Sequence, residues 1–218
     1  MAPELMECKG FKDAKNLLSM LNDIISLKKN EPDKYILLTG NHTDSYIWSR
    51  FDAATRTDYE NWEKYHKFFL ENLNLFNLVW VENDVIFSHA GISEGWAKVV
   101  CTKMDSEFES ILQTAKILQN IPLNEVHNND KLVSLLGNIS YYRYGNYNYG
   151  SCEWADIREH FNMKESTSDS IISNIKENVF QVFGHSQVKV PIISNNWICL
   201  DCRKGFIFDT ITHEINEG

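Results

Sequence analysis

The chain has 218 residues, 43% of them hydrophobic and 23% charged, which is typical of an ordinary globular protein with enough material for one sizeable domain. Its formal net charge of −9 argues against a general nucleic-acid-binding surface, because phosphate backbones are held by clustered Lys and Arg. The sequence has neither an apolar run of about eighteen residues, as a membrane span requires, nor a signal-peptide pattern at its start.

The first half of the chain alternates helical and strand patterns. Apolar side chains recur at the helical period of 3.6 residues over 11–29, a Pro-containing turn follows, and an apolar strand begins at residue 35. This order is that of the second half of a βαβ unit, and the first strand of the unit is not in the chain. A second helix is predicted over 59–74, and the segments 76–81 and 85–88 flank a good hairpin turn.

The second half begins with a helical, irregular pattern, which indicates an insertion at about 93–140 in a single α/β domain spanning 1–218. Residues 141–149 are rich in Tyr, Asn and Gly, the composition of a loop. Such a loop could stack a nucleobase, although plain packing is the commoner use. The elements predicted beyond it are helices near 154–161 and 170–177, a strand at 179–183, and a closing hairpin of 197–200 with 205–209.

The five cysteines are odd in number and scattered, which is typical of reduced thiols, so we expect a cytoplasmic protein. Cys199 and Cys202 form a C-x-x-C motif, which can bind zinc or carry out redox chemistry. No second such motif supplies the remaining zinc ligands, and a redox pair usually opens a helix. Residues 197–200, which include Cys199, and residues 205–208 instead have the pattern of two strands around a turn, and we interpret the two cysteines as structural residues.

Three apolar, strand-like segments end abruptly in a turn that carries histidine. They place Asn41 and His42, His89, and His185 directly after a predicted strand. In an open α/β sheet such turns line one crevice at the carboxyl ends of the strands, where ligands bind. An Asn oxygen and imidazole nitrogens suit Mn, Fe or Zn better than Ca or Mg. One Asn and three His that converge on such a crevice therefore suit a transition-metal site.

Each of these residues also has an ordinary structural interpretation when taken alone. Asn41 could cap a turn, His89 and His185 could be hydrogen-bonded histidines at the edge of a core, and Arg143 could be a surface charge. The metal-site hypothesis depends on their conjunction and order. Four other histidines have no motif around them and are predicted to be surface residues: His66, His127, His160 and His213.

These segments resemble the calcineurin-like metallophosphoesterases, most closely the phosphoprotein phosphatase branch. Gly40-Asn41-His42 resembles the family's G-N-H-[ED] motif, and Thr43 departs from it, with Asp44 one place later. The segments 88–91 and 183–186 resemble its two histidine motifs. Residues 150–156 resemble its Trp-Ala/Ser-Asp segment, which follows an arginine-containing loop, and 198–201 resemble its closing I-x-[IL]-D strand.

The resemblance implies an α/β fold, a β-sandwich flanked by helices, and a metal-dependent phosphomonoester hydrolase that uses metal-activated water. It implies that Asn41, His89 and His185 bind metal, that His42 is the general acid, and that Arg143 holds the phosphate through a bidentate fork. The implied substrate is phosphorylated, most simply a phosphoprotein. Nucleic acid and membrane partners are not expected.

The family's first two motifs, G-D-x-H and G-D-x-x-[DN]-R, are absent from the sequence. They supply the ligands of the first ion and the bridging carboxylate of a two-metal site. We therefore expect the chain to lack the N-terminal strands of the fold, to support at most one ion, and to show little or no phosphatase activity alone. Two alternatives remain open: a catalytically incompetent binding module, and a nucleotide or dinucleotide polyphosphate hydrolase on the same scaffold.

Overall fold

A computed structural model describes residues 14–48, 57–160 and 179–218, so the helix predicted at 170–177 lies outside the described residues. The chain separates into two compact units. The first unit comprises Met1–Asn77 and Pro122–Val133, and the second comprises Leu78–Ile121 and Ser134–Gly218. None of the helices in the described ranges is long and apolar enough to cross a membrane.

The first unit is helical, with one short parallel strand pair. The amphipathic helix predicted at the start is α2, Ala14–Asn30, which buries Leu17, Leu21 and Ile25. Strand β1, Leu37–Leu38, pairs in parallel with β2, Phe76–Asn77. The other elements that the structure describes in this unit are α3 (Asn41–Ile47), η3 (Tyr59–Asn61), α4 (Trp62–Glu71), η4 (Leu73–Leu75) and α7 (Leu123–His127). The helix predicted at 59–74 is thus present in three consecutive pieces.

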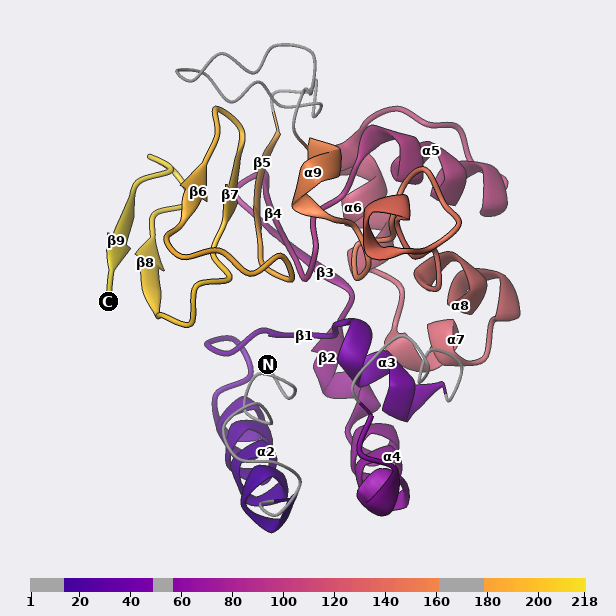
Figure 1. The fold of residues 1–218 in the computed structure, drawn as a ribbon, viewed down its shortest axis with the longest axis vertical. Coiled ribbons are helices and arrows are strands. Elements are labelled where there is room, and N and C mark those ends of the chain that lie inside the picture. Colours follow the sequence, from indigo (N-terminus) through magenta and orange to yellow (C-terminus); the bar gives the residue numbers. More distant parts are fainter. Residues whose placement is uncertain (1–13, 49–56, 161–178) are drawn as a thin grey trace. The chain divides into compact units, whose positions relative to one another are not determined.

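The second unit is built on a five-stranded mixed sheet in the order β3-β4-β5-β7-β6 (Figure 1). Strands β4 and β5, and strands β5 and β7, are parallel neighbours, while the outer pairs are antiparallel. The bounds of the strands are β3 (Val79–Glu82), β4 (Val85–Ser88), β5 (Phe180–Phe183), β6 (Ile192–Ile193) and β7 (Trp197–Cys199). The predicted α/β class is confirmed, while the sandwich, the single domain and the insertion stay predictions.

Helices α5, α6 and α9 lie on one side of this sheet in Figure 1. Serine caps begin two of them: Ser93 Oγ accepts from Trp96 N at 3.2 Å, and Ser110 Oγ accepts from Gln113 N at 3.0 Å. The bounds are α5 (Glu94–Lys103), α6 (Ile111–Gln119), η5 (Tyr141–Arg143) and α9 (Ile157–His160), and α8 (Asp130–Leu136) crosses the boundary between the units. The irregular helical character predicted for 93–139 is confirmed.

The predicted hairpin turn before β4 is confirmed. Strands β3 and β4 pair antiparallel, and Asn83 and Asp84 between them have φ values of 47° and 61°. Positive φ at both central residues is the signature of the two-residue turn that matches the twist of a hairpin, and Asn and Asp tolerate it better than most residues.

The predicted closing hairpin is wrong. Strand β7 pairs with β5 and β6, whereas β8, Phe206–Phe208, pairs antiparallel with β9, Ile215–Glu217, in a separate two-stranded sheet. Burial explains the choice. Trp197, Ile198 and Cys199 are fully buried and fit a central strand, whereas β8 carries the exposed Ile207 and packs through Phe208 on Phe87 and Phe180.

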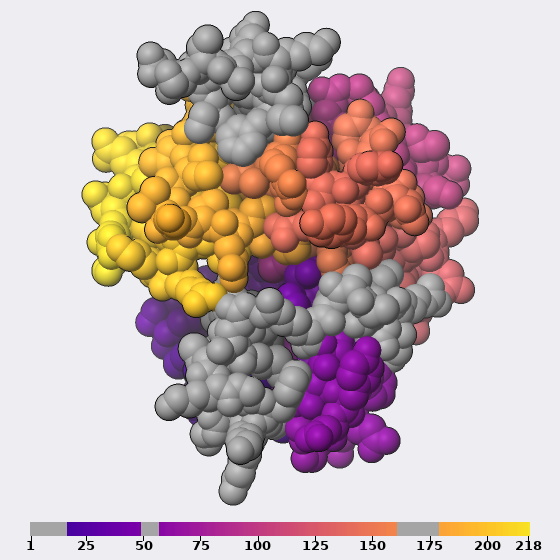
Figure 2. All heavy atoms as spheres, in the orientation of Figure 1, coloured from indigo at the N-terminus to yellow at the C-terminus, as the bar shows by residue number. Residues whose placement is uncertain are grey.

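The core of the sheet is apolar and continuous across its strands. Val85, Phe180, Val182 and Ile198 form a buried cluster, against which Phe208 and Ile215 of the small sheet pack. Figure 2 shows segment 179–218 of the second unit, in gold and yellow, lying against the orange segment that ends at His160. One hydrogen bond between these segments joins Ile157 N to Ser186 Oγ at 3.0 Å.

Candidate functional site

His89 and His185 lie side by side at the carboxyl ends of two neighbouring parallel strands. His89 follows β4 directly, and His185 follows β5 after Gly184. The distance between His89 Nε2 and His185 Nδ1 is 3.1 Å, and Gly184 N donates to the carbonyl of His89 at 2.9 Å. The sheet therefore brings together two of the predicted metal ligands, because parallel strands end at the same edge.

The backbone at His185 has a left-handed conformation, with φ of 65°. Such a conformation is uncommon for a residue with a side chain and persists where its surroundings fix it. Here Arg143 Nη2 donates to the carbonyl of His185 at 3.1 Å. The thiol of Cys199 faces the carbonyls of Gly184 and Ser186 at 3.7 and 3.4 Å. Hydrogen-bond donors thus hold three successive carbonyls of this turn.

The thiol of Cys199 is a structural donor rather than a reactive group. Burial raises the pKa of Cys199 to about 11, so that the thiol keeps its proton at neutral pH. Cys199 and Cys202 are both free cysteines. Cys199 lies in β7 and Cys202 follows the strand, which agrees with their interpretation as structural residues.

Arg143 is held at the site by three groups. Its Nε lies 2.7 Å from Asp156 Oδ2, and its Nη2 donates to Ser186 Oγ at 2.8 Å as well as to the carbonyl of His185. Asp156 also accepts from Arg158, whose Nε lies 2.7 Å from Oδ1 and whose Nη2 lies 3.2 Å from Oδ2. The structure thus brings Arg143 to the histidine pair, as the motif order predicts.

Two guanidinium groups, those of Arg143 and Arg158, contact the carboxylate of Asp156 beside the histidines. Burial alone would raise the pKa of Asp156, but hydrogen bonds from Arg158 and the charges of both arginines outweigh it and hold the pKa below its ordinary value of 3.8. Asp156 therefore stays ionised at neutral pH.

His160 is buried, and its prediction as a surface residue is wrong. Its side chain has an exposed fraction of 0%, its Nε2 lies 3.3 Å from the carbonyl of Ala90, and its ring packs on Phe183 and Trp197. Burial lowers the pKa of His160 to about 4, so the ring is neutral at pH 7. The prediction rested on the lack of a motif around His160, and no local pattern revealed its contact with Ala90, 70 residues earlier.

Asn41 and His42 belong to the first unit, where they open helix α3. Asn41 is buried, whereas His42 is half-buried and its carbonyl accepts from Ser45 Oγ at 2.9 Å. The sequence predicted that Asn41 and His42 stand in a turn directly after the strand. Gly40 instead has φ of −159° and ψ of 167°, an extended conformation open to any residue, and the helix follows it directly.

The geometry of the histidine pair fits two ligands of one ion. Nitrogens bound to a common ion at 2.0–2.1 Å lie roughly 3.0–3.4 Å apart, and the observed separation is 3.1 Å. The same separation fits a direct hydrogen bond between the rings. Within residues 14–48, 57–160 and 179–218, no cluster of three or more His, Cys, Asp or Glu side chains is placed to hold a metal.

A scan against protein-family models finds no match, and a search of curated proteins finds no significant match. Among solved structures, the chain is similar to one described as a cold-active protein tyrosine phosphatase. The identity is 18%, the TM-score is 0.44, and the match covers 77% of this chain and 48% of that protein. The chain thus spans about half the length of the solved structure. A likeness this distant carries no argument about family or activity.

Proposed function

We propose that the protein is a metal-dependent phosphomonoester hydrolase whose substrate is a phosphoprotein. The observation that carries the proposal is the pair formed by His89 and His185 at 3.1 Å, with Arg143 held beside it. Imidazoles for a transition metal and a guanidinium for an oxyanion are the two groups that such chemistry needs at one place. The motif order of the sequence supports the same chemistry.

In this proposal His89 and His185 hold a divalent Mn, Fe or Zn ion. When bound, such an ion supplies a Lewis acid and lowers the pKa of a water molecule. Arg143 binds the substrate phosphate. Its Nε and Nη2 are engaged by Asp156, Ser186 and the His185 carbonyl, and only its Nη1 makes no hydrogen bond to the described residues. We therefore propose a contact with phosphate through Nη1 in place of the bidentate fork that the resemblance implies.

Two further roles come from the resemblance alone. Asn41 is proposed as a third metal ligand and His42 as the general acid that protonates the leaving oxygen, a role suited to imidazole because its pKa lies near neutrality. Both residues lie in the first unit, where His42 is half-buried. Arg158 is not assigned a chemical role, since its contacts with Asp156 account for its position.

The test compares the 218-residue chain with the variants His89→Ala and His185→Ala, and with His213→Ala as an exposed control in the same unit. Mn²⁺ binding is measured by isothermal titration, and hydrolysis with p-nitrophenyl phosphate. We expect each site variant to weaken Mn²⁺ binding by about 100-fold, and the control to leave it unchanged. Hydrolysis should be slow, because ligands for a second ion are not recognisable in the sequence, and it should depend on both histidines.

Besides a complete lack of hydrolysis, two results would contradict the proposal. One is Mn²⁺-dependent hydrolysis that persists undiminished in His89→Ala, and the other is the absence of Mn²⁺ binding to the unmodified chain. Binding of a phosphoprotein without any turnover in the presence of Mn²⁺ would favour a binding module instead.

A further inference from the structure

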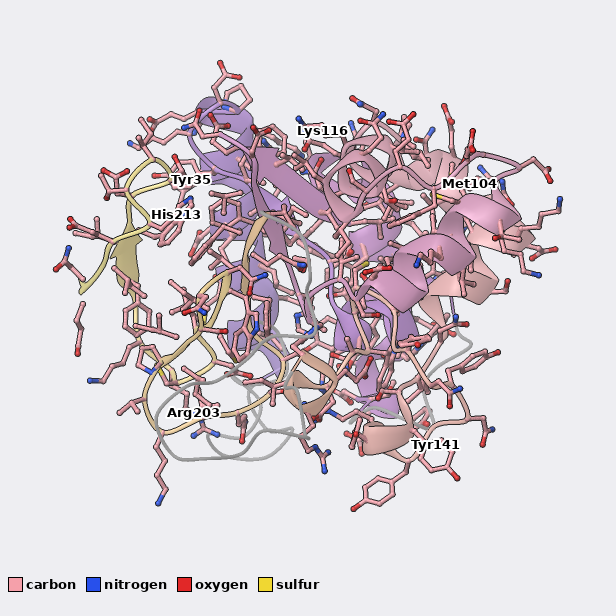
Figure 3. The ribbon with its side chains drawn as sticks, turned by 90° about the horizontal axis from the view of Figure 1, so that it is seen from above. Tyr35, Met104, Lys116, Tyr141, Arg203 and His213 are labelled. Atoms are coloured by element: carbon pink, nitrogen blue, oxygen red, sulfur yellow. The ribbon has the colours of Figure 1, made fainter. Side chains whose placement is uncertain are left out.

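Residues 141–149, here named the tyrosine loop, display aromatic rings to solvent beside Arg143. Four of its five tyrosines are exposed: Tyr144 at 100%, Tyr141 at 71%, and Tyr147 and Tyr149 at 47% each. Tyr141 lies at the outer margin of the side chains in Figure 3. A single exposed aromatic ring is ordinary, but several on nine consecutive residues form a contact surface.

The backbone of this loop is held by its own hydrogen bonds. Tyr141 N donates to the carbonyl of Tyr147 at 2.7 Å, and Tyr147 N donates to that of Ile139 at 3.3 Å. Gly145 N donates to the carbonyl of Ser140 at 2.9 Å, and a Cβ at Gly145 would lie 2.1 Å from the Ile139 oxygen. The rings are therefore presented from a preorganised backbone, which lowers the entropic cost of binding a partner.

The conformation of Tyr144 is unfavourable for the stability of the fold. Its φ is 62°, a left-handed conformation that bulky side chains adopt at a cost and that Asn or Gly adopts more readily. Its ring is fully exposed, so no burial offsets that cost. A strained residue without a packing role is an indication of function.

The loop is continuous with the candidate site. Arg143, which we propose to bind phosphate, lies between Tyr142 and Tyr144, and its Nη2 donates to the His185 carbonyl. Arg158 lies over the ring of Tyr142 at 5.0 Å and donates to its carbonyl at 2.5 Å. A phosphate bound by Arg143 therefore brings the rest of its molecule within reach of the exposed rings.

We infer that the tyrosine loop is the surface that binds the polypeptide around the phosphorylated side chain of a phosphoprotein substrate. The inference rests on the proposed function. Tyr with Asn and Gly is the composition of loops that bind protein surfaces, where the rings supply large contacts at small entropic cost. The formal net charge of −9 disfavours a polyanionic nucleic acid as the occupant.

The experiment uses phosphorylated casein as the polypeptide substrate and β-glycerophosphate as a phosphomonoester with neither a ring nor a peptide bond. The variant is Tyr141→Ser/Tyr144→Asn/Tyr147→Ser, and the control is Tyr59→Ser, a tyrosine 65% exposed outside the loop. We expect the ratio of kcat/KM for phosphocasein to kcat/KM for β-glycerophosphate to fall about tenfold in the variant, through KM. The control should leave the ratio unchanged.

An unchanged ratio in the triple variant overturns the inference. The inference is also overturned if the triple variant hydrolyses a 5′-nucleotide more slowly but phosphocasein at the unchanged rate. That result would identify a base-stacking loop instead. If the unmodified chain hydrolyses none of these substrates, the proposed function fails, but binding of phosphocasein by surface plasmon resonance still tests the loop. Weaker binding by the triple variant then supports the inference, and equal binding overturns it.

The single variant Tyr144→Asn separates recognition from folding. Because Asn adopts positive φ more readily, its Tm should be unchanged or about 2 °C higher, while its kcat/KM for phosphocasein falls. A lower Tm would mean that the ring stabilises the fold and would overturn the inference. Damage to the loop would lower both the Tm and kcat/KM. An unchanged or higher Tm together with a lower kcat/KM therefore indicates a loss of recognition.

Discussion

Replacing Gly91 with alanine should destabilise the second unit through a specific clash with His160. Gly91 has φ of 86°, and an added Cβ would lie 2.6 Å from His160 Nε2 and 3.1 Å from Phe183 Cδ1. Real Cβ atoms essentially never come within 3.0 Å of another atom, and His160 is fully buried, so its ring has little room to move away. The backbone and the packing therefore both oppose the substitution.

The expected cost follows from these two contributions. Alanine at a left-handed φ costs about 1–2 kcal/mol, and overpacking of a well-packed core typically costs about 1–3 kcal/mol. Part of this is offset because alanine lowers the conformational entropy of the unfolded chain, an effect of about 0.4–1 kcal/mol. We expect Gly91→Ala to lower the free energy of unfolding by about 2–4 kcal/mol.

The free energy of unfolding is measured by urea denaturation, followed by tryptophan fluorescence. The matched control is Gly205→Ala, since an added Cβ there meets nothing within 4 Å and the φ of Gly205 is not positive. The control should change the free energy by less than about 0.5 kcal/mol. A double-mutant cycle with His160→Ala isolates the clash with the ring, because in that background Gly91→Ala keeps the backbone cost of roughly 1–2 kcal/mol and the close contact with Phe183 but loses the contact with His160.

Equal costs of Gly91→Ala in the two backgrounds would refute the assigned contact between Gly91 and His160. A cost below about 0.5 kcal/mol in the wild-type background would refute the strain as well.

Three further predictions concern charge and burial. Asp156→Asn should lower the free energy of unfolding by about 1–3 kcal/mol at pH 7, because Arg143 and Arg158 lose their partner. The depressed pKa of Asp156 gives a stabilising contribution that is present above pH 3.8 and is lost as the pH falls through the lower native pKa. The variant should therefore lose less stability than the wild type when the pH is lowered through this range. A pH series of urea titrations measures both. The pKa of His160, lowered to about 4, predicts that unfolding becomes easier by up to about 1.4 kcal/mol per pH unit as the pH falls from 6.5 toward 4, and His160→Gln should remove this slope; an identical slope would contradict the burial assigned to the ring. Cys199, whose pKa is raised to about 11, should stay unmodified by iodoacetamide at pH 8 in the folded protein and react in urea, and mass spectrometry showing its modification in the native state would refute its role as a buried donor.

The sequence predicted the parts of the fold that depend on local pattern. The 3.6-residue period identified helix α2, and the turn residues Asn83 and Asp84 identified the β3–β4 hairpin. The adjacency of His89 and His185 was also predictable, because histidine-bearing turns after parallel strands meet at one edge of a sheet. Periodicity and turn chemistry act over a few residues, so a single sequence displays them.

The features that the sequence did not predict depend on contacts between distant residues. Composition showed that β7 and β8 are strands, but not which strand each pairs with, and the partner of β8 is the later strand β9. Similarly, the burial of His160 depends on Ala90 and Gly91, which lie about 70 residues away in the chain. Tertiary partners of this kind leave no periodic trace in one sequence.

The parallel pairing of β4 with β5 also has a consequence for folding. His89 and His185 are 96 residues apart in the chain, so their contact closes a long loop and carries a large entropic cost. A folding intermediate that lacks this strand pair cannot contain the histidine pair. A spectroscopic probe on the two rings would therefore report the completion of the second unit, and insertions between the two strands could lengthen the intervening segment at a small entropic cost without disturbing the pair.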